Sequence, residues 1–189
     1  MPTPSTQRVR IIGGLFRGRV IRFPKVSGLR PTPDRVRETL FNWLGQDLTD
    51  LTTLDLFAGS GALSLEALSR GAARAVAIDR DPALIHAIEA TAQAFGATIL
   101  EGHAAPARSW LQRESRRFDV IFLDPPFATD EWDWLLPACS ARLAGGGAIY
   151  AEAPRLLVPP SELAVDRHAK AGQVHYHLLR RADPPPPSP

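Results

Sequence analysis

From residue 51 onward the chain repeats one order, in which a short apolar run is followed by an amphipathic stretch. This alternation is typical of an α/β protein with a doubly wound, mostly parallel sheet. The predicted strands are at residues 53–57, 75–78, 97–100, 120–123 and 148–152, with helices at 62–68, 82–95, 108–112 and 132–143 and a glycine turn at 145–147. Two late strands near residues 163–166 and 174–179 complete a seven-stranded Rossmann-like sheet.

The length of 189 residues suits one well-buried core with a small appendage, and it is too short for two full domains. We predict four parts from local composition: a disordered tail at 1–7, a basic extension at 8–45, the main α/β domain at 46–181 and a proline-rich disordered tail at 182–189. The appendage therefore precedes the main domain.

Charge is distributed unevenly along the chain. Residues 1–37 hold nine basic side chains and one acid, a net charge of +8, while the remainder carries −6. Such asymmetry favours a polyanionic partner for the first segment, and the alternative is a solvated basic face. Eight of the nine basic residues are arginines, whose forked guanidinium suits phosphate contacts.

The basic segment begins with a predicted hairpin, with strands at 9–12 and 15–23 around Gly13-Gly14. In the second strand, arginines alternate with apolar residues, so Arg17, Arg19 and Arg22 are expected on one exposed face. Guanidinium groups on such a face can bind phosphates without reading sequence.

A helix is predicted after Thr32, which is a good N-cap before Pro33. One apolar stripe carries the core-facing side chains of this helix, and Gly45 ends it. The stripe consists of Val36, Leu40, Trp43 and Leu44, and the side chains off it that are expected to be available to a partner are Arg35 and Arg37.

The buried strand at 120–123 stops at Asp124, which is followed by two prolines and Phe127. Proline has no N–H to donate and keeps the preceding residue extended, so nearby carbonyls are left free to accept hydrogen bonds. An acid, free carbonyls and an aromatic face are what a planar base with an exocyclic amine requires. The alternative is that these residues only terminate a strand.

A glycine loop, Gly59-Ser60-Gly61, separates the first strand from its helix, as in nucleotide-binding loops. Asp79 ends the next strand, 20 residues beyond Gly59, where an acid can accept hydrogen bonds from ribose hydroxyls. Asp55 adds a second carboxylate, which would repel a dinucleotide phosphate and suits a cationic cofactor such as S-adenosylmethionine. Asp55 could equally be a structural acid bonded to nearby backbone N–H groups.

Several of these stretches resemble known motifs. LDLFAGSG at 54–61 resembles motif I of class I S-adenosylmethionine-dependent methyltransferases, and DPPF at 124–127 resembles the motif of those that methylate exocyclic amines. RIIGG at 10–14, RGR at 17–19 and LRPTPDRVRETLFNWL at 29–44 are similar to the RsmD family of bacterial 16S rRNA guanine-N2 methyltransferases. The similarity extends from Arg8 to Leu179. One departure is His103, where an Asp or Asn commonly binds the adenine amine.

The resemblance implies S-adenosylmethionine as the cofactor and 16S rRNA, within a partly or fully assembled small ribosomal subunit, as the partner. It implies that the N2 amine of an unpaired guanine accepts the methyl group while held by Asp124 and the Pro125 carbonyl. The implied cofactor residues are Asp55, Phe57, Ala58, Gly59, Ser60, Gly61, Asp79, Arg80, His103, Ala104 and Asp124. The implied substrate residues are Arg10, Arg17, Arg19, Arg30, Arg35, Arg37, Pro126 and Phe127.

A monomer without a metal ion is expected. Cys139 is the only cysteine, which excludes an intramolecular disulfide and fits a reducing, cytoplasmic setting, and no run is apolar enough for a membrane span. Two alternatives stay open: an adenine-N6 DNA or RNA methyltransferase, which shares the DPPF motif, and a nucleic-acid binding module that has lost catalysis. An NAD enzyme is a more distant one.

Overall fold

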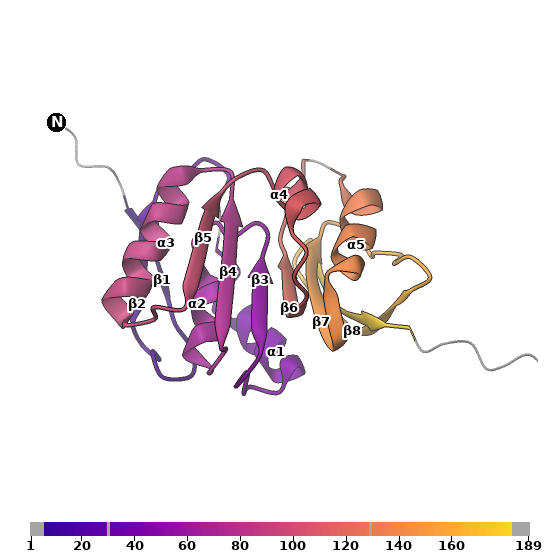
Figure 1. Cartoon of the computed structure of the whole chain (residues 1–189). Coiled ribbons are helices and arrows are strands. Elements are labelled where there is room, and N and C mark those ends of the chain that lie inside the picture. Colours follow the sequence, from indigo (N-terminus) through magenta and orange to yellow (C-terminus); the bar gives the residue numbers. More distant parts are fainter. Residues whose placement is uncertain (1–5, 30, 129, 183–189) are drawn as a thin grey trace, which may run out of the picture.

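The structure is a computed structural model that describes residues 6–29, 31–128 and 130–182. Its main sheet has seven strands in the order β5-β4-β3-β6-β7-β9-β8 (Figure 1). The first five strands in this order are parallel, and β9 is antiparallel to both of its neighbours. The seven strands are β3 (Thr52–Asp55), β4 (Arg74–Asp79), β5 (Leu100–Ala104), β6 (Phe118–Leu123), β7 (Leu143–Ala153), β8 (Leu163–Ala171) and β9 (Val174–Arg181). The predicted fold class is confirmed.

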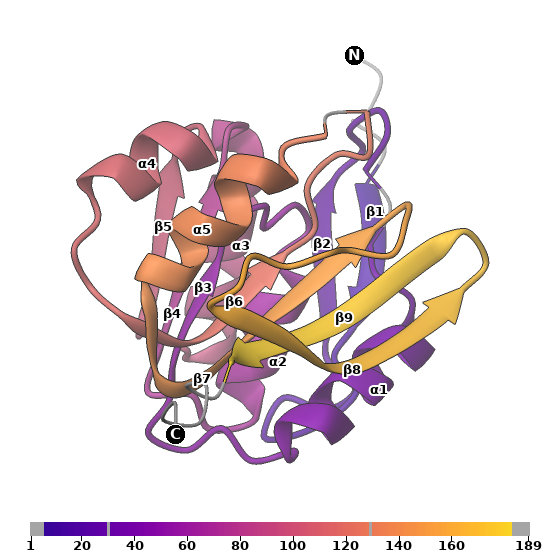
Figure 2. The same cartoon turned by 90° about the vertical axis from the view of Figure 1, so that its right-hand side faces the viewer.

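Helices cover both faces of the sheet, as Figures 1 and 2 show. One face packs against α1 (Asp34–Leu44), α2 (Ala62–Ser69) and α3 (Pro82–Phe95), and the other packs against α4 (Ala107–Arg113) and α5 (Trp132–Ala141). Alternation along the central strands explains this division. Phe122 and Tyr150 belong to the cluster on the α1 side, whereas Ile121 and Ile149 belong to the cluster on the α5 side.

The N-terminal hairpin exists, but its first strand begins earlier, its second strand is shorter and the connection between them is longer than predicted. The two strands are β1 (Thr6–Arg10) and β2 (Val20–Pro24), and residues 11–19 form the connection. Thr6 and Gln7 belong to β1, so the predicted disordered tail was wrong at these two positions, and residues 1–5 lie outside the described residues. The other predicted tail also lies outside them except for Ala182, whose N–H donates to the Glu162 carbonyl at 3.0 Å.

The hairpin connection is fixed by α2. Gly14 has φ of 72°, and a Cβ there would lie 1.8 Å from the Ser69 carbonyl oxygen, so only glycine fits. The N–H of Leu15 donates to that oxygen at 2.6 Å, and the N–H of Phe16 donates to the Ser69 hydroxyl at 2.8 Å. These contacts replace the strand pairing that the sequence pattern predicts.

The start of α1 also differs from the prediction. Pro33 is the N-cap residue and Thr32 makes no capping bond, because its hydroxyl donates to the Glu152 carboxylate at 2.9 Å. Gly45 ends the helix in the left-handed conformation, as predicted. Val36 and Leu40 are buried as expected, together with Phe41. Trp43 stacks on Tyr176 of β9 with ring centroids 5.4 Å apart, and Leu44 packs at the margin of the same hydrophobic cluster.

Several strand boundaries differ from the predicted ones, and the largest differences are at β5 and β7. β5 lies at Leu100–Ala104 rather than at 97–100, because Gly96 and Ala97 finish the cap of α3. Glu89 and Ile85 of α3 then pack so closely over Gly102 that a Cβ there would lie 2.7 Å from the Glu89 carboxylate. The glycines at 145–147 are not a turn before a strand but belong to β7, which shifts register against β6 in this region.

Glu66 of α2 connects the hairpin, α1 and α2. Its carboxylate is fully buried and accepts hydrogen bonds from the backbone N–H groups of Ile12 and Gly13 at 2.9 and 2.8 Å. It also forms ion pairs with Arg37 and Arg70 at 3.1 and 2.9 Å. The extension therefore shares one hydrophobic cluster and one buried polar cluster with the main domain.

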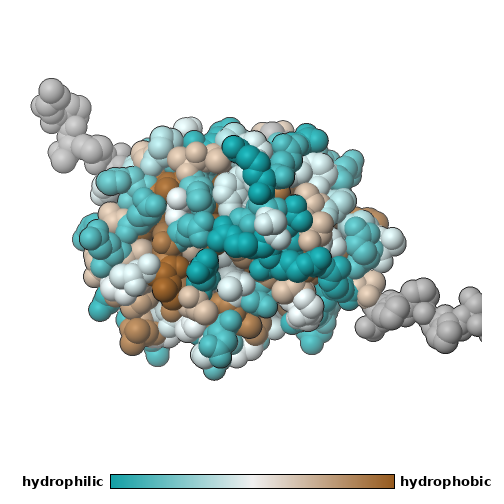
Figure 3. All heavy atoms as spheres, viewed as in Figure 1, coloured by the Kyte–Doolittle hydropathy of each residue, from teal (hydrophilic) through white to brown (hydrophobic). Residues whose placement is uncertain are grey.

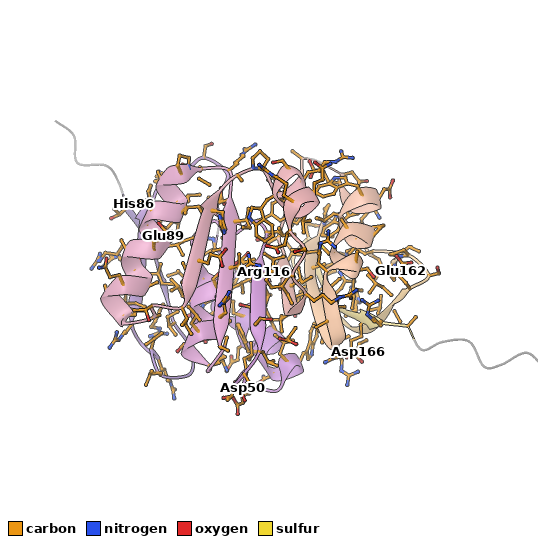
Figure 4. The ribbon with its side chains drawn as sticks, in the orientation of Figure 1. Asp50, His86, Glu89, Arg116, Glu162 and Asp166 are labelled. Carbon is orange, nitrogen blue, oxygen red and sulfur yellow. The ribbon has the colours of Figure 1, made fainter. Side chains whose placement is uncertain are left out.

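The face of the sheet turned to the viewer in Figure 3 is hydrophilic across its middle. Figure 4 places Arg116 there, and its guanidinium forms ion pairs with Glu101 at 2.8 Å and Glu114 at 2.6 Å. These charges cover the part of the sheet beside α4 that has no helix in front of it. Within the described ranges, no helix is long and apolar enough to cross a membrane.

Candidate functional site

Four acidic residues gather at one edge of the sheet. Asp55 ends β3, Asp79 ends β4, Glu152 is the penultimate residue of β7, and Asp124 directly follows β6. Because these strands are parallel, their carboxyl ends meet at the same edge. In open α/β sheets this is the edge at which ligands bind.

The glycine loop lies between two of these strands. Gly61 is the N-cap of α2 with φ of 75°, and a Cβ there would lie 2.6 Å from Ile88 of α3. The Gly59 N–H donates to Asp79 Oδ2 at 2.9 Å, while Asp79 Oδ1 accepts from the Asp81 N–H at 2.9 Å. Asp79 therefore holds the loop directly against the end of β4.

Asp55 is buried beneath the loop. Its Oδ2 accepts a hydrogen bond from the Ser64 hydroxyl at 2.8 Å, which supports the structural role for this acid, and its side chain also lines the cavity described below. Burial raises the pKa of Asp55 to about 7, opposed by the hydrogen bond from Ser64 and assisted by the negative charge of Asp79.

The raised pKa of Asp55 predicts a pH-dependent cost to stability. The folded state binds more protons than the unfolded state between about pH 4 and pH 7, so the free energy of unfolding falls as pH rises through this window. Each unit of pKa difference corresponds to about 1.4 kcal/mol. The variant Asp55→Asn is expected to lose this dependence, as measured by urea unfolding at several pH values. Identical pH dependence in both proteins would contradict the expectation.

A small cavity of about 30 Å³ opens between the glycine loop and the extension. Leu29 and Thr32 contribute one wall from the segment before α1, and the loop and Asp124 contribute the other. Its lining consists of Leu29, Pro31, Thr32, Asp55, Phe57, Ala58, Gly59, Ser60, Ala62, Leu63 and Asp124. The structure thus brings together six of the predicted cofactor residues, Asp124 among them.

A second cavity of about 200 Å³ is lined by residues that directly follow Asp124 in the chain. The Pro125-Pro126-Phe127 stretch lines it, together with Trp132 and Pro154. An ion pair between Asp130 and Arg155, at 2.9 Å, completes the lining. Phe127 is 45% exposed, so its ring is accessible to a ligand. Asp124 lines the small cavity and the next residue, Pro125, lines the larger one.

The remaining predicted cofactor residues lie outside both cavity linings. Ala104 ends β5 and is the register partner of Asp79 at the end of β4. His103 Nε2 lies 2.6 Å from Glu101 Oε1, so the imidazole is turned toward this carboxylate. Arg80 follows Asp79 and is exposed. These residues extend the site along the edge toward β5.

The predicted substrate arginines do not form one surface. Arg37 is fully buried, donating to the Thr32 and Arg10 carbonyls and pairing with Asp34 and Glu66, so the prediction that it is available to a partner was wrong. Arg30 lies outside the described residues.

The alternation of Arg17 and Arg19 along a strand was also wrong, because both lie in the hairpin connection. Arg17 is exposed, and Arg19 lies over the rings of Phe95 and Phe16 at 5.0 and 5.4 Å. The exposed face of the hairpin instead carries Arg8, Arg10 and Arg22, of which Arg8 and Arg22 are register partners. Arg35 is exposed on α1.

Sequence reasoning missed Glu152 as part of the site. Its carboxylate is 5% exposed and accepts hydrogen bonds from the hydroxyls of Thr32 and Tyr150 at 2.9 and 2.8 Å. The available signal was its position as the last residue of a predicted strand, equivalent to that of Asp79. Burial raises the pKa of Asp124, and the negative charges of Glu152 and Asp55 raise it further.

The sequence is similar to those of known small-subunit rRNA methyltransferases. The chain is 42% identical over 182 residues to the ribosomal RNA small subunit methyltransferase D of Escherichia coli, covering 92% of this chain and 90% of that protein. It is 34% identical to the protein of the same name from Haemophilus influenzae, covering 94% and 97% of the two chains.

Solved structures of methyltransferases have the same fold as this chain. The Escherichia coli protein yhhF superposes with a TM-score of 0.83 at 40% identity, covering 93% of this chain and 98% of that one. A Thermus thermophilus 16S rRNA N2 G1207 methyltransferase, solved with AdoMet and guanosine, shares the fold with a TM-score of 0.71 at 20% identity, covering 96% and 52% of the two chains. The family model described as "Conserved hypothetical protein 95" matches residues 9–180. The chain therefore belongs to this family, the RsmD family of small-subunit rRNA methyltransferases.

Proposed function

We propose that this protein transfers a methyl group from S-adenosylmethionine to the exocyclic N2 amine of a guanine in 16S rRNA. The observation that carries the proposal is that two consecutive residues line two different cavities, Asp124 the small one and Pro125 the larger one. One cavity has the glycine loop as its wall, and the other has Phe127. A methyl donor in the first cavity and an acceptor base in the second would both lie close to Asp124.

The residues on the glycine-loop side fit the cofactor. S-adenosylmethionine supplies an activated methyl group on a positively charged sulfur. Asp55 and Asp124 favour positive charge in the small cavity, and the backbone of Gly59 and Gly61 allows close approach. Asp79 has lone pairs beyond those used by Gly59 and Asp81, so it can accept hydrogen bonds from ribose hydroxyls. Arg80, His103 and Ala104 would flank the adenosyl group.

The residues on the other side fit an amine on a planar base. Asp124 and the Pro125 carbonyl would accept hydrogen bonds from the two amine hydrogens and direct the nitrogen lone pair toward the methyl group. Phe127 would stack on the base, and Pro126 would support it. Entry into a cavity of about 200 Å³ requires an unpaired or extruded nucleotide.

The basic extension at 8–45 would bind the phosphates of the rRNA. Arg8, Arg10 and Arg22 form its exposed hairpin face, and Arg17 and Arg35 are further exposed arginines of the same extension. The relatives act on small-subunit rRNA by name. We accordingly propose that the protein works as a monomer in the cytoplasm, on a partly or fully assembled small ribosomal subunit.

The hairpin face gives a quantitative prediction. Replacing Arg8 and Arg22 with glutamine is expected to weaken RNA binding and to reduce the slope of log K against log salt by about 0.7–0.9 for each phosphate that is no longer neutralised. Affinity for S-adenosylmethionine should not change. The matched control is Arg113→Gln on α4, on the other side of the sheet. An unchanged slope in the double variant would refute the role of the hairpin.

The test of the proposed function is methyl transfer from radiolabelled S-adenosylmethionine to small subunits from cells that lack the enzyme, with naked 16S RNA in parallel. Nucleosides are then separated. Label in N2-methylguanosine is the expected result. Label in N6-methyladenosine would overturn the base assignment and keep the cofactor. No label on any RNA or DNA would favour a binding module without catalysis.

A further inference from the structure

Glu152 stands beside Asp124 in the sheet. In the parallel pair of β6 and β7, Phe122 pairs with Tyr150 and Leu123 with Ala151, so Asp124 and Glu152 come next in register. Paired residues of neighbouring strands point to the same face, and the strands are about 5 Å apart. That face is the α1 side, because Phe122 packs against Phe41 with ring centroids 6.2 Å apart.

Glu152 is held in place from two directions. Tyr150, two residues earlier on the same strand, donates its hydroxyl to Glu152 Oε1 at 2.8 Å. Thr32, in the segment between the hairpin and α1, donates to the same oxygen at 2.9 Å. Thr32 also lines the small cavity with Asp124, and its carbonyl accepts from Arg37 at 3.2 Å. The second carboxylate is thus anchored to the basic extension as well as to the sheet.

We propose that Glu152 is a positioning residue for methyl transfer, a buried second carboxylate that orients Asp124 and strengthens it as the acceptor of the proton that the amine releases. This inference rests on the proposed function and adds to it the fate of the proton. Because the amine loses a proton when it is methylated, a proton acceptor is required next to the amine nitrogen.

During the step, the amine nitrogen forms a bond to the methyl carbon as the carbon–sulfur bond breaks, and the positive charge passes from sulfur to nitrogen. The nitrogen then loses one proton: its N–H bond breaks and an O–H bond forms on Asp124. An ordinary aspartate, with a pKa of about 3.9, is a weak acceptor. A second negative charge nearby increases the proton affinity of Asp124.

The charges around the pair agree with this role. Burial raises the pKa values of both Asp124 and Glu152, and the charge of Glu152 raises that of Asp124 further. The titratable groups near Glu152 are Asp124 directly after β6, Tyr150 on β7, Tyr176 at the paired position on β9 and, close to Asp124, Asp55 on β3. Arg37 is connected to Glu152 only indirectly, because Arg37 donates to the Thr32 carbonyl and the Thr32 hydroxyl donates to Glu152. Asp55 is present in the wild type and in each variant below, so a difference between the proteins reports on the residue that is changed.

The test is the pH profile of the maximal methyl-transfer rate on small subunits, compared between wild type and Glu152→Gln. Glutamine keeps an acceptor oxygen for Thr32 and Tyr150 but removes the charge. We expect the acidic limb to move to lower pH by roughly one unit, because Asp124 then loses its proton more easily. The maximal rate should fall roughly tenfold, because Asp124 becomes a weaker acceptor.

A second variant and a control complete the experiment. Thr32→Val removes a hydrogen bond that favours the charged form of Glu152. Glu152 then carries less negative charge near Asp124, so the acidic limb of this variant should also move to lower pH, but by less than in Glu152→Gln. Asp119→Asn, at the opposite end of β6, should keep the wild-type profile. If a Glu152→Gln protein that is folded and binds S-adenosylmethionine shows its acidic limb at the wild-type pH, the role of Glu152 is overturned. The proposed function is not affected by that result. A wild type without any transfer would overturn the proposed function and this inference with it.

Discussion

Asp124→Asn is expected to lower the maximal methyl-transfer rate by roughly 100- to 1000-fold, a loss in the range found when one preorganised stabilising group is removed. An amide oxygen can still accept one hydrogen bond, but it carries no charge to stabilise the positive nitrogen and cannot take its proton. The rate with saturating S-adenosylmethionine and small subunits measures the effect.

The decrease in rate should not come from unfolding. Asp124 is a half-buried acid whose raised pKa shows that its charge is unfavourable in the folded state, so an amide should be tolerated at this position. Asp119→Asn, a change of the same type on the same strand, should retain the wild-type rate. Wild-type transfer by a folded Asp124→Asn protein would remove Asp124 from the mechanism.

Glu66→Ala should destabilise the protein by about 3–5 kcal/mol, the range for breaking a buried ion pair by removing one partner. Arg37 would be left with less charge compensation in a fully buried position, and two backbone N–H groups of the hairpin connection would be deprived of their acceptor. Urea unfolding measures the change. Because the hairpin would then be attached less firmly, RNA binding should also weaken.

The control for Glu66 is Glu38→Ala, an exposed acid on α1. A surface substitution of this kind should change the free energy of unfolding by no more than about 0.5 kcal/mol. If Glu66→Ala behaved like this control, the buried cluster would not be what attaches the extension to the main domain.

Local pattern was sufficient for the central sheet and for the two parts of the site that follow strands. The apolar run at 120–123 is continuous because β6 is buried on both faces, and Asp124 is found where the run stops. The glycine loop and Asp79 were located by the same reasoning, and the Gly59–Asp79 hydrogen bond connects them. In each case the information lies within a few residues of the strand end.

Three departures from the sequence predictions share one physical cause, which is contact between segments distant in sequence. Arg37 lies off the apolar stripe of α1 as a surface arginine would, but Glu66, 29 residues later, makes its burial favourable. The hairpin connection bonds to Ser69, more than 50 residues away, in place of the predicted strand pairing. Glu152 could be seen at a strand end, but its bond to Thr32 spans 120 residues.

The most direct test of the account is a crystal structure with S-adenosylhomocysteine and guanosine bound. We predict the ribose hydroxyls on Asp79, the sulfur near the small cavity beside Asp124, and the guanine amine hydrogen-bonded to Asp124 and the Pro125 carbonyl, with the ring on Phe127. Guanosine bound with another edge toward Asp124, or S-adenosylhomocysteine bound away from the Gly59–Gly61 loop, would contradict it.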